Sequence, residues 1–159
     1  MKYRVGIGYD VHQLKQDCPF YLGGIKIESP FGAIGHSDAD VLIHAIIDSL
    51  LGAASLRDIG YLYPDTNKEF KGIDSKILLK DTIEKVREKG FKIENIDTII
   101  CLQSPKISSY IPQMQQTLSK VMDIDLEDIN IKATTTEHLG FVGKKEGVAA
   151  HSVCLLSRD

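Results

Sequence analysis

The sequence lacks an excess of positive charge and any long hydrophobic run, and each absence excludes a class of protein. Among 159 residues, 19 Lys and Arg stand against 22 Asp and Glu, which gives a net charge of −3 at pH 7. A basic patch is the usual signature of nucleic-acid binding, so we expect no nucleic-acid partner. No apolar run approaches the length needed to span a bilayer, so we expect no membrane partner either.

Cysteine is scarce and irregularly spaced. Cys18, Cys101 and Cys154 are the only three, and none belongs to a Cys-x-x-Cys pair. This usage is typical of a reducing compartment. The strand pattern begins at the N-terminus, without the charged and apolar regions of a signal peptide. We therefore expect a cytoplasmic protein, or one of a plastid-type stroma if the chain is a processed form.

Strand and helix patterns alternate along the chain without a repeat or a linker, which predicts a single domain over residues 1–159. Alternating or continuous apolar runs predict strands at 3–12, 129–135 and 148–156, a strand covered on both faces at 96–102, and a short hairpin at 20–27. Apolar stripes predict a helix capped by Ser37 or Asp38, one from Asp74 to Gly90, and one beginning at Ser108 or Ser109. This order favours a two-layer α/β (α+β) sandwich, in which a mixed β-sheet carries its helices on one face.

The most informative stretch is Gly8-Tyr9-Asp10-Val11-His12, taken together with His44. Residues two apart on a strand point to the same face, so Asp10 and His12 project together. With His44 they form a two-histidine, one-carboxylate set, whose open fourth position is typical of catalytic zinc. Asp48, one helical turn after His44, is expected to accept the other ring N–H and fix the tautomer. The plainer alternative is a polar cluster beside a histidine on the rim of a helix.

Polar residues at the start of the first predicted helix suggest an anion site. Free N–H groups and the helix dipole favour an anion there, and His36 and Ser37 are placed to contact a phosphate. Asp40 is a candidate to bind the hydroxyls of a polyol. The alternative is that Ser37 or Asp38 only caps the helix.

Polar groups also follow two predicted strands. Thr134, Thr135 and Thr136 offer hydroxyl and backbone N–H groups to phosphate oxygens, and Glu137 suits a hard Mg²⁺ ion that bridges two phosphates. In residues 103–106, backbone groups can read a base edge while the lysine neutralises a phosphate. The plainer alternatives are a β-branched strand end and an ordinary turn. Three loop residues are further candidates to hold a diol: Asp58, Gly60 and Asp65.

Taken together, these segments resemble the family of 2-C-methyl-D-erythritol 2,4-cyclodiphosphate synthase. The segments that carry the resemblance are, in order, Gly8 to His12, Gly35 to Val41 with His44, Asp58-Ile59-Gly60, Pro64-Asp65-Thr66, Lys132 to Glu137, Leu139-Gly140-Phe141 and Glu146-Gly147. They cover nearly the whole chain, and several motifs in the right order are more specific than any one alone. No nucleophile elbow, P-loop, complete Rossmann fingerprint or His-Glu-x-x-His motif competes with this interpretation.

The resemblance implies a homotrimer with active sites between subunits. It implies conversion of 4-diphosphocytidyl-2-C-methyl-D-erythritol 2-phosphate into the cyclic diphosphate and CMP, in the non-mevalonate isoprenoid pathway. It also implies Zn²⁺ at Asp10, His12 and His44, and Mg²⁺ or Mn²⁺ near Glu137. We assign catalytic roles to His36, Thr135 and Asp48. The residues expected around the erythritol and its phosphates are Asp10, His12, His36, Ser37, Asp40, Asp58, Gly60 and Asp65. Those expected around the cytidine diphosphate are Leu102, Gln103, Ser104, Pro105, Lys106, Ala133, Thr134, Thr135, Thr136 and Glu137.

Two positions depart from the family pattern. Tyr63 stands where Phe is usual, and Lys144 stands where Arg is usual. Phe141 and Lys144 are expected to line a central cavity where family members bind isoprenoid diphosphates, and Lys offers such a ligand a point charge rather than a planar fork. A zinc hydrolase acting on a phosphodiester and a non-catalytic nucleotide-binding module remain as alternatives to the cyclase.

Overall fold

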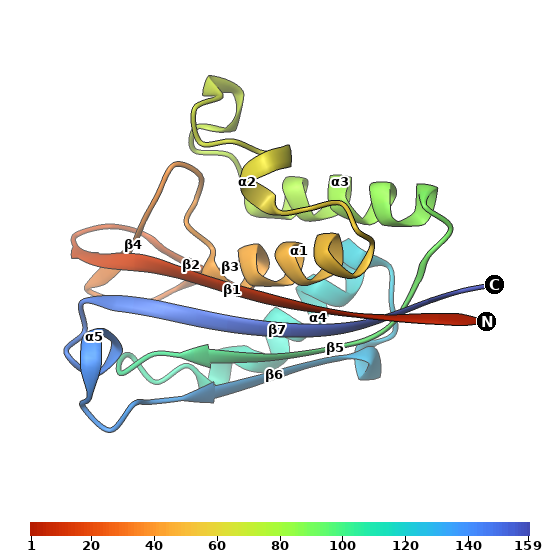
Figure 1. Ribbon diagram of the computed structural model, residues 1–159. Coiled ribbons are helices and arrows are strands. Elements are labelled where there is room, and N and C mark those ends of the chain that lie inside the picture. The colour runs from red at the N-terminus through yellow and green to blue at the C-terminus, as the bar shows by residue number, and fades with distance from the viewer.

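The computed structural model describes residues 1–159 and confirms a mixed sheet with helices packed against it (Figure 1). The five-stranded sheet has the order β4-β1-β7-β5-β6. Its strands are β1 (Lys2–Gln16), β4 (Phe31–Ile34), β5 (Lys92–Cys101), β6 (Ile129–Thr134) and β7 (Gly147–Arg158). Neighbouring strands are antiparallel except β5 and β6, which are parallel and therefore need a crossover connection.

The helical layer supplies that crossover and covers the sheet. Its helices are α1 (Val41–Ala53), α3 (Ser75–Glu88) and α4 (Ile111–Met122), with the short α2 (Ile59–Leu62) and α5 (Gly140–Gly143). Single 3₁₀ turns occupy Lys68–Phe70, Ser108–Tyr110 and Leu126–Asp128. The predicted ends of α3 are confirmed, because Asp74 accepts a hydrogen bond from the N–H of Lys76 and Gly90 has a positive φ of 79°. None of the helices is long and apolar enough to cross a membrane.

Two glycines of β1 let α1 approach the strand closely. A Cβ at Gly6 would lie 1.9 Å from the carbonyl oxygen of Ser49, and one at Gly8 would lie 1.8 Å from that of Ala45. Any side chain there would push the helix away from the sheet. Because residues two apart share a face, the same row of β1 continues into Asp10 and His12, under the N-terminal half of α1.

The opposite face of the sheet is apolar and open in the single chain. Alternation alone favours burial of Tyr3, Val5 and Ile7, yet these side chains are 58%, 70% and 74% exposed. Along β5 too, fully buried residues alternate with partly exposed ones, so the prediction of a strand covered on both faces is wrong for the single chain. The helices cover one face only, and an apolar sheet face of this kind is typical of an interaction surface.

Some local features differ from the sequence-based expectation. The N-cap of α1 is Asp40, whose side chain accepts from the N–H of Ile43, rather than Ser37 or Asp38. A 3₁₀ turn precedes α4, which therefore begins at Ile111, with Pro112 tolerated in its first turn as expected. The hairpin of β2 (Phe20–Leu22) and β3 (Ile25–Ile27) forms as predicted. The short edge strand β4 was not expected, because its four residues show no clear alternation.

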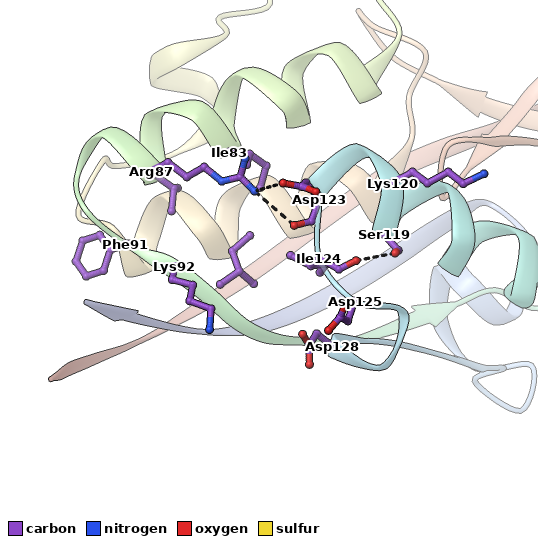
Figure 2. A pocket seen from close by; sticks show the side chains of 12 residues that line it. Ile83, Arg87, Phe91, Lys92, Ser119, Lys120, Asp123, Ile124, Asp125 and Asp128 are labelled. Carbon is purple, nitrogen blue, oxygen red and sulfur yellow. Dashed lines mark hydrogen bonds and ion pairs between the residues drawn. The ribbon is translucent and has the colours of Figure 1, made fainter. Parts of the chain in front are cut away.

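A cavity of about 770 Å³ lies between the C-terminal ends of α3 and α4 (Figure 2). Among the residues that line it, Arg87 and Asp123 form an ion pair, with Nη2 and Oδ2 3.1 Å apart. The cavity contains none of the predicted site residues and no convergent set of metal-ligating side chains. Size alone therefore does not locate the functional site, whereas convergent polar groups do.

Candidate metal centre and active site

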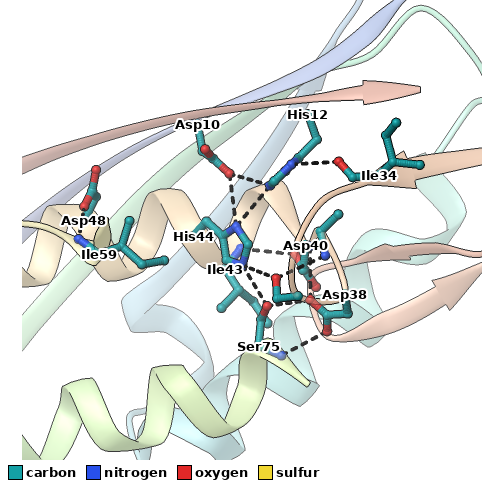
Figure 3. Close-up of polar contacts among 12 residues, drawn as sticks. Asp10, His12, Ile34, Asp38, Asp40, Ile43, His44, Asp48, Ile59 and Ser75 are labelled. Carbon is teal, nitrogen blue, oxygen red and sulfur yellow. Dashed lines mark hydrogen bonds and ion pairs between the residues drawn. The ribbon is translucent and has the colours of Figure 1, made fainter. Parts of the chain in front are cut away.

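Asp10, His12 and His44 converge beside the N-terminal half of α1 (Figure 3). The Oδ2 atom of Asp10 lies 2.9 Å from Nε2 of His12 and 3.2 Å from Nδ1 of His44. The two histidine nitrogens are 3.1 Å apart. The prediction that these three residues form one cluster is confirmed, and the cluster has the composition of a divalent-metal site.

The orientation of the His12 ring is fixed by the edge strand β4. Its Nδ1–H donates to the carbonyl oxygen of Ile34 at 3.2 Å. A carbonyl oxygen can only accept, so the lone pair of the neutral ring lies on Nε2, which faces the cluster. Gly35 leaves room for the ring, because a Cβ at this position would lie 3.0 Å from its Cε1 atom.

Within the cluster, the pKa values of Asp10 and His12 are shifted from their usual values. Burial alone would raise the pKa of Asp10, but hydrogen bonds with His12 and His44 outweigh burial and lower the pKa to about 2. Burial alone would lower the pKa of His12, but its hydrogen bond and charge interaction with Asp10 raise the pKa overall. Asp10 is therefore an anion at neutral pH, held between two imidazoles, and the three groups together suit a divalent cation.

The predicted role of Asp48 beside His44 is wrong. Nε2 of His44 lies 2.8 Å from Oγ of Ser75 and 3.2 Å from Oγ of Ser37. Asp48 instead accepts the N–H of Ile59 at 2.8 Å. Helical side chains lean toward the N-terminus of their own helix, so His44 turns toward the start of α3 and away from a residue one turn later. Asp48 thus holds the start of α2.

The predicted contact of Asp40 with a polyol is also wrong. The side chain is fully buried, and its carboxylate accepts N–H groups from Gly23 at 3.0 Å, Gly24 at 2.7 Å and Ile43 at 3.1 Å. Burial raises its pKa, and these backbone donors offset part of that cost. Asp40 joins the β2–β3 turn to the start of α1 and does not reach a ligand.

A cavity of about 390 Å³ opens beside the metal cluster. The structure brings four further predicted residues to its wall: His36, Ser37, Gly60 and Asp65. Asp58 is not among the lining residues, because it caps α2 by accepting the N–H of Tyr61 at 2.9 Å. Sequence reasoning missed the apolar part of the wall, which consists of Ile59, Tyr63, Phe70 and Leu78. Ile59 lay in the Asp58-Ile59-Gly60 motif without being singled out, and Tyr63 was noted only for its departure from the usual Phe.

Two tethers hold the segment between α2 and α3 against the cavity. Nε2–H of His36 donates to the carbonyl oxygen of Asn67 at 3.0 Å. The Tyr63 hydroxyl donates to Oδ2 of Asp81 at 2.5 Å and lies 3.0 Å from Oγ1 of Thr82, both on α3. Burial and the neighbouring Asp81 carboxylate raise the pKa of Tyr63, so the hydroxyl keeps its proton. The extra oxygen that distinguishes this tyrosine from Phe therefore ties the segment to α3.

The other two predicted segments lie together at the C-terminal ends of β5 and β6. The N–H of Leu102 donates to the carbonyl oxygen of Thr134 at 2.9 Å, and the N–H of His138 donates to Oε1 of Gln103 at 3.2 Å. Lys106 and Glu137 are exposed, as are Phe141 and Lys144 of the α5 region. None of these residues lines the cavity beside Asp10.

The register of the sheet shows how the two groups are related. Ala149 of β7 pairs with Val11 on one side and with Cys101 on the other. The end of β5 is therefore level with the part of β1 that carries Asp10 and His12, two strands away, or roughly 10 Å across the sheet. Each chain thus presents two sets of polar groups at the same end of the sheet, in separate places.

The chain carries a two-histidine, one-carboxylate cluster in the wall of a polar cavity, on an α/β sandwich. This combination is typical of metal-dependent enzymes. The YgbB family model matches residues 3–157, and the chain belongs to this family. A protein of Bacteroides thetaiotaomicron named 2-C-methyl-D-erythritol 2,4-cyclodiphosphate synthase is 56% identical over 159 residues, which is 100% of both chains. This agrees with the resemblance that the sequence motifs indicate.

Solved structures lead to the same family. The chain is similar to the bifunctional IspDF from Campylobacter jejuni, with a TM-score of 0.95 and 46% identity, over 99% of this chain and 43% of that longer one. It is also similar to the CDP complex of IspF from Plasmodium falciparum, with a TM-score of 0.87 and 34% identity, over 99% of this chain and 97% of that one.

Proposed function

We propose that this chain converts 4-diphosphocytidyl-2-C-methyl-D-erythritol 2-phosphate into 2-C-methyl-D-erythritol 2,4-cyclodiphosphate and CMP. The observation that carries the proposal is the Asp10, His12 and His44 cluster in the wall of a polar cavity. Membership of the YgbB family and full-length relatives named as this synthase support it. The activity is a phosphoryl transfer within one molecule.

Zinc is the ion that the cluster suits best. Tetrahedral zinc binds its nitrogen and oxygen ligands at about 2.0–2.2 Å, which places ligand atoms roughly 3.3–3.5 Å from one another. The three ligand atoms lie 2.9–3.2 Å apart, so a small outward adjustment suffices. Imidazole and carboxylate are ligands that zinc accepts readily. Zinc held by three protein ligands supplies a Lewis acid that polarises a phosphate oxygen.

The substrate carries its own nucleophile, so the protein need not provide one. An oxygen of the 2-phosphate attacks the β-phosphorus, the bond from that phosphorus to the CMP oxygen breaks, and CMP leaves with the electron pair. Intramolecular reactions of well-oriented groups recover about 7–11 kcal/mol of a barrier. The work of the protein is then to orient the two phosphates and to neutralise their charge.

The cavity wall offers groups for that orientation. Ser37 and Asp65 face the cavity with a hydroxyl and a carboxylate that suit the erythritol hydroxyls. The Nε2–H of His36 is already used by the carbonyl of Asn67. His36 therefore donates to a phosphate from Nδ1, when the ring is protonated. Its side-chain contact with Asn67 and its backbone contact with Gly72 hold it in the wall of the cavity.

We assign the cytidine diphosphate to the segments 102–106 and 133–137. They adjoin each other through the parallel pairing of β5 with β6, and their threonine hydroxyls and backbone groups suit phosphate and base edges. Glu137 is an exposed hard ligand beside them, which suits Mg²⁺ or Mn²⁺. Such an ion offsets the charge that develops on CMP as it leaves. We assign Thr135 to a contact with the transferred phosphate.

We further propose that the enzyme is a homotrimer whose active sites lie between subunits. Two features support this arrangement. The face of the sheet that carries Tyr3, Val5 and Ile7 is apolar and exposed, as expected of a surface covered in an assembly. The two groups of substrate-binding residues do not line one cavity within a chain, so a neighbouring subunit can bring the second group to the first.

A central cavity of such a trimer is the proposed place for an isoprenoid diphosphate. Phe141 is 41% exposed and suits the isoprenoid tail. The exposed Lys144 follows it after one turn and suits the diphosphate. Lys provides a single charged group here, in place of the two parallel hydrogen bonds that Arg gives.

Phosphorus NMR of the reaction tests the proposed activity. The enzyme loaded with zinc and magnesium is incubated with the cytidyl substrate, and the products are followed with time. We expect the paired signals of a cyclic diphosphate to grow together with that of CMP. A linear product would support hydrolysis by a metal-bound water, and binding without turnover would support a nucleotide-binding module. Either result would overturn the proposal.

A further inference from the structure

Ser75, the first residue of α3, connects the metal cluster to an acidic residue outside it. The serine is fully buried. Its Oγ lies 2.8 Å from Nε2 of His44 and 2.5 Å from Oδ1 of Asp38 (Figure 3). Asp38 is held in turn, because its carboxylate accepts the N–H of Ser75 at 2.9 Å and the N–H of Asp40 at 3.2 Å. His44, Ser75 and Asp38 thus form a continuous chain of hydrogen bonds.

The direction of each hydrogen bond in this chain follows from the chemistry of its ends. A carboxylate only accepts, so the hydroxyl of Ser75 donates its single proton to Asp38. The serine oxygen then has only lone pairs to offer His44, so Nε2 must carry the imidazole proton. The lone pair of the neutral ring is thereby placed on Nδ1, the atom that faces Asp10 at 3.2 Å.

We propose that Asp38 and Ser75 are positioning residues that hold His44 in the tautomer able to bind the metal. The inference rests on the metal site proposed above and assigns the role first expected of Asp48 to a serine and a carboxylate from other elements. Partners of this kind fix the tautomer of metal-binding histidines, and their loss costs about 10–100-fold in metal affinity. Ile34 does the same for His12 through a backbone carbonyl.

A merely structural role for the two residues makes a different prediction. Asp38 also accepts the first N–H of α3, so its loss can destabilise the helix without affecting the metal. The Asp38→Asn variant separates the two roles. The amide oxygen replaces only one of the two carboxylate oxygens: where it keeps the N–H of Ser75, the NH₂ group takes the place of Oδ1, gives up the N–H of Asp40 and donates toward the serine oxygen. The serine hydroxyl then turns and donates to Nε2 of His44, which forces the proton onto Nδ1 and blocks the metal ligand.

This reversal gives the variants an unusual order of zinc affinity. We expect Asp38→Asn to bind zinc about 10–100-fold more weakly than the wild type. Ser75→Ala should lose less zinc affinity than Asp38→Asn, because Oγ of Ser37, which lies 3.2 Å from Nε2 of His44, remains as an acceptor. The double variant should bind more tightly than Asp38→Asn alone, because no hydroxyl remains at position 75 to donate to Nε2. If both residues had only a structural role, the losses of zinc affinity in the two single variants would add up in the double variant.

The experiment is a zinc titration of metal-stripped protein in competition with a chromophoric chelator, with thermal unfolding recorded for each variant. Asp74→Asn is the matched control, because it removes an exposed carboxylate next to Ser75 while keeping an equally good helix cap. Its zinc affinity should equal that of the wild type. The visible spectrum of the cobalt-substituted proteins provides a second readout of the ligand geometry.

The outcomes separate the two proposals. If the wild type binds no zinc, the metal site fails and the inference fails with it. If the wild type binds zinc and both single variants match it within twofold, the metal site stands and the hydrogen-bond chain is refuted. A loss in Asp38→Asn that Ser75→Ala partly restores supports the inference. Should Asp38→Asn not fold, Ser75→Ala decides alone, since a several-fold loss supports the role and unchanged affinity refutes it.

Discussion

Replacing Gly8 with alanine should both destabilise the protein and weaken its metal site. The new Cβ would lie 1.8 Å from the carbonyl oxygen of Ala45 and 2.9 Å from the backbone nitrogen of Ser49. Both neighbours are backbone atoms of α1 and cannot rotate away. Relief of the contact therefore requires α1 and β1 to separate by roughly 1 Å, and overpacking of this kind typically costs about 1–3 kcal/mol. Alanine lowers the entropy of the unfolded chain, but by less than this cost.

The same separation moves His44, which directly precedes Ala45, away from Asp10 and His12. Distances in a metal site tolerate deviations of only about 0.2 Å, so zinc affinity should fall together with stability. Gly52→Ala is the control on the same helix, because no atom lies within 4 Å of its added Cβ. That change should raise stability by up to about 1 kcal/mol through helix propensity and leave zinc binding unchanged. Thermal unfolding and chelator competition measure both quantities, and a Gly8→Ala protein with wild-type values in each would refute the close-packing argument.

Four further predictions concern the cavity, the second ion and the assembly. Tyr63→Phe should lower the free energy of unfolding at neutral pH, because it removes the hydrogen bond to Asp81. Burial alone would raise the pKa of Asp81, but its hydrogen bonds with Lys85 and Tyr63 lower it overall. The difference in stability from the wild type should therefore persist above about pH 4 and shrink as the pH falls through that lowered pKa. Denaturant titrations at several pH values measure it, and a difference that grows in acid would contradict the assigned bond. Glu137→Gln should weaken the magnesium dependence of turnover and leave the zinc content of the protein unchanged, whereas loss of zinc would show that the two sites were confused. Mixing inactive His44→Ala and Glu137→Ala subunits should restore part of the activity, and a mixed oligomer verified by mass spectrometry that stays inactive would exclude shared sites. Lys144→Arg should bind an isoprenoid diphosphate more tightly in calorimetry, with turnover unchanged. The gain in binding free energy should be up to that of one charged hydrogen bond, about 1.5–3 kcal/mol. If neither form binds the ligand, the proposed isoprenoid diphosphate is wrong.

The cluster of Asp10, His12 and His44 was predictable because its information is local. Asp10 and His12 are two residues apart on a strand, and His44 lies on the rim of an amphipathic helix, so period and spacing suffice to bring them to one region. The main helices and strands follow from the same periodicities. The apolar cavity wall was not predictable in this way, because Tyr63, Phe70 and Leu78 meet only through the path of a loop between α2 and α3.

The errors at Asp48 and Asp40 have a common cause. Both residues share a helical stripe with His44, and spacing alone treats the members of a stripe as equivalent. The structure distinguishes them by depth and by the direction in which side chains lean. Asp40 is capped inside the fold by the β2–β3 turn, and Asp48 is taken by the start of α2. The partner that His44 does find, Ser75, is 31 residues away along the chain, beyond the reach of any periodic argument.

The metal site is a continuation of the packing between α1 and β1. One face of β1 carries Gly6 and Gly8, followed by Asp10 and His12, in a single row of alternate residues. The glycines bring the helix into contact with the strand, and that contact sets the distance at which His44 meets Asp10. A shift of the strand by one residue would place Tyr9 and Val11 under the helix and turn both ligands to the open face. The same alternation that brings Asp10 and His12 under the helix also leaves the apolar residues of β1 exposed, so one choice of strand face sets both the proposed metal site and the surface proposed for subunit contact.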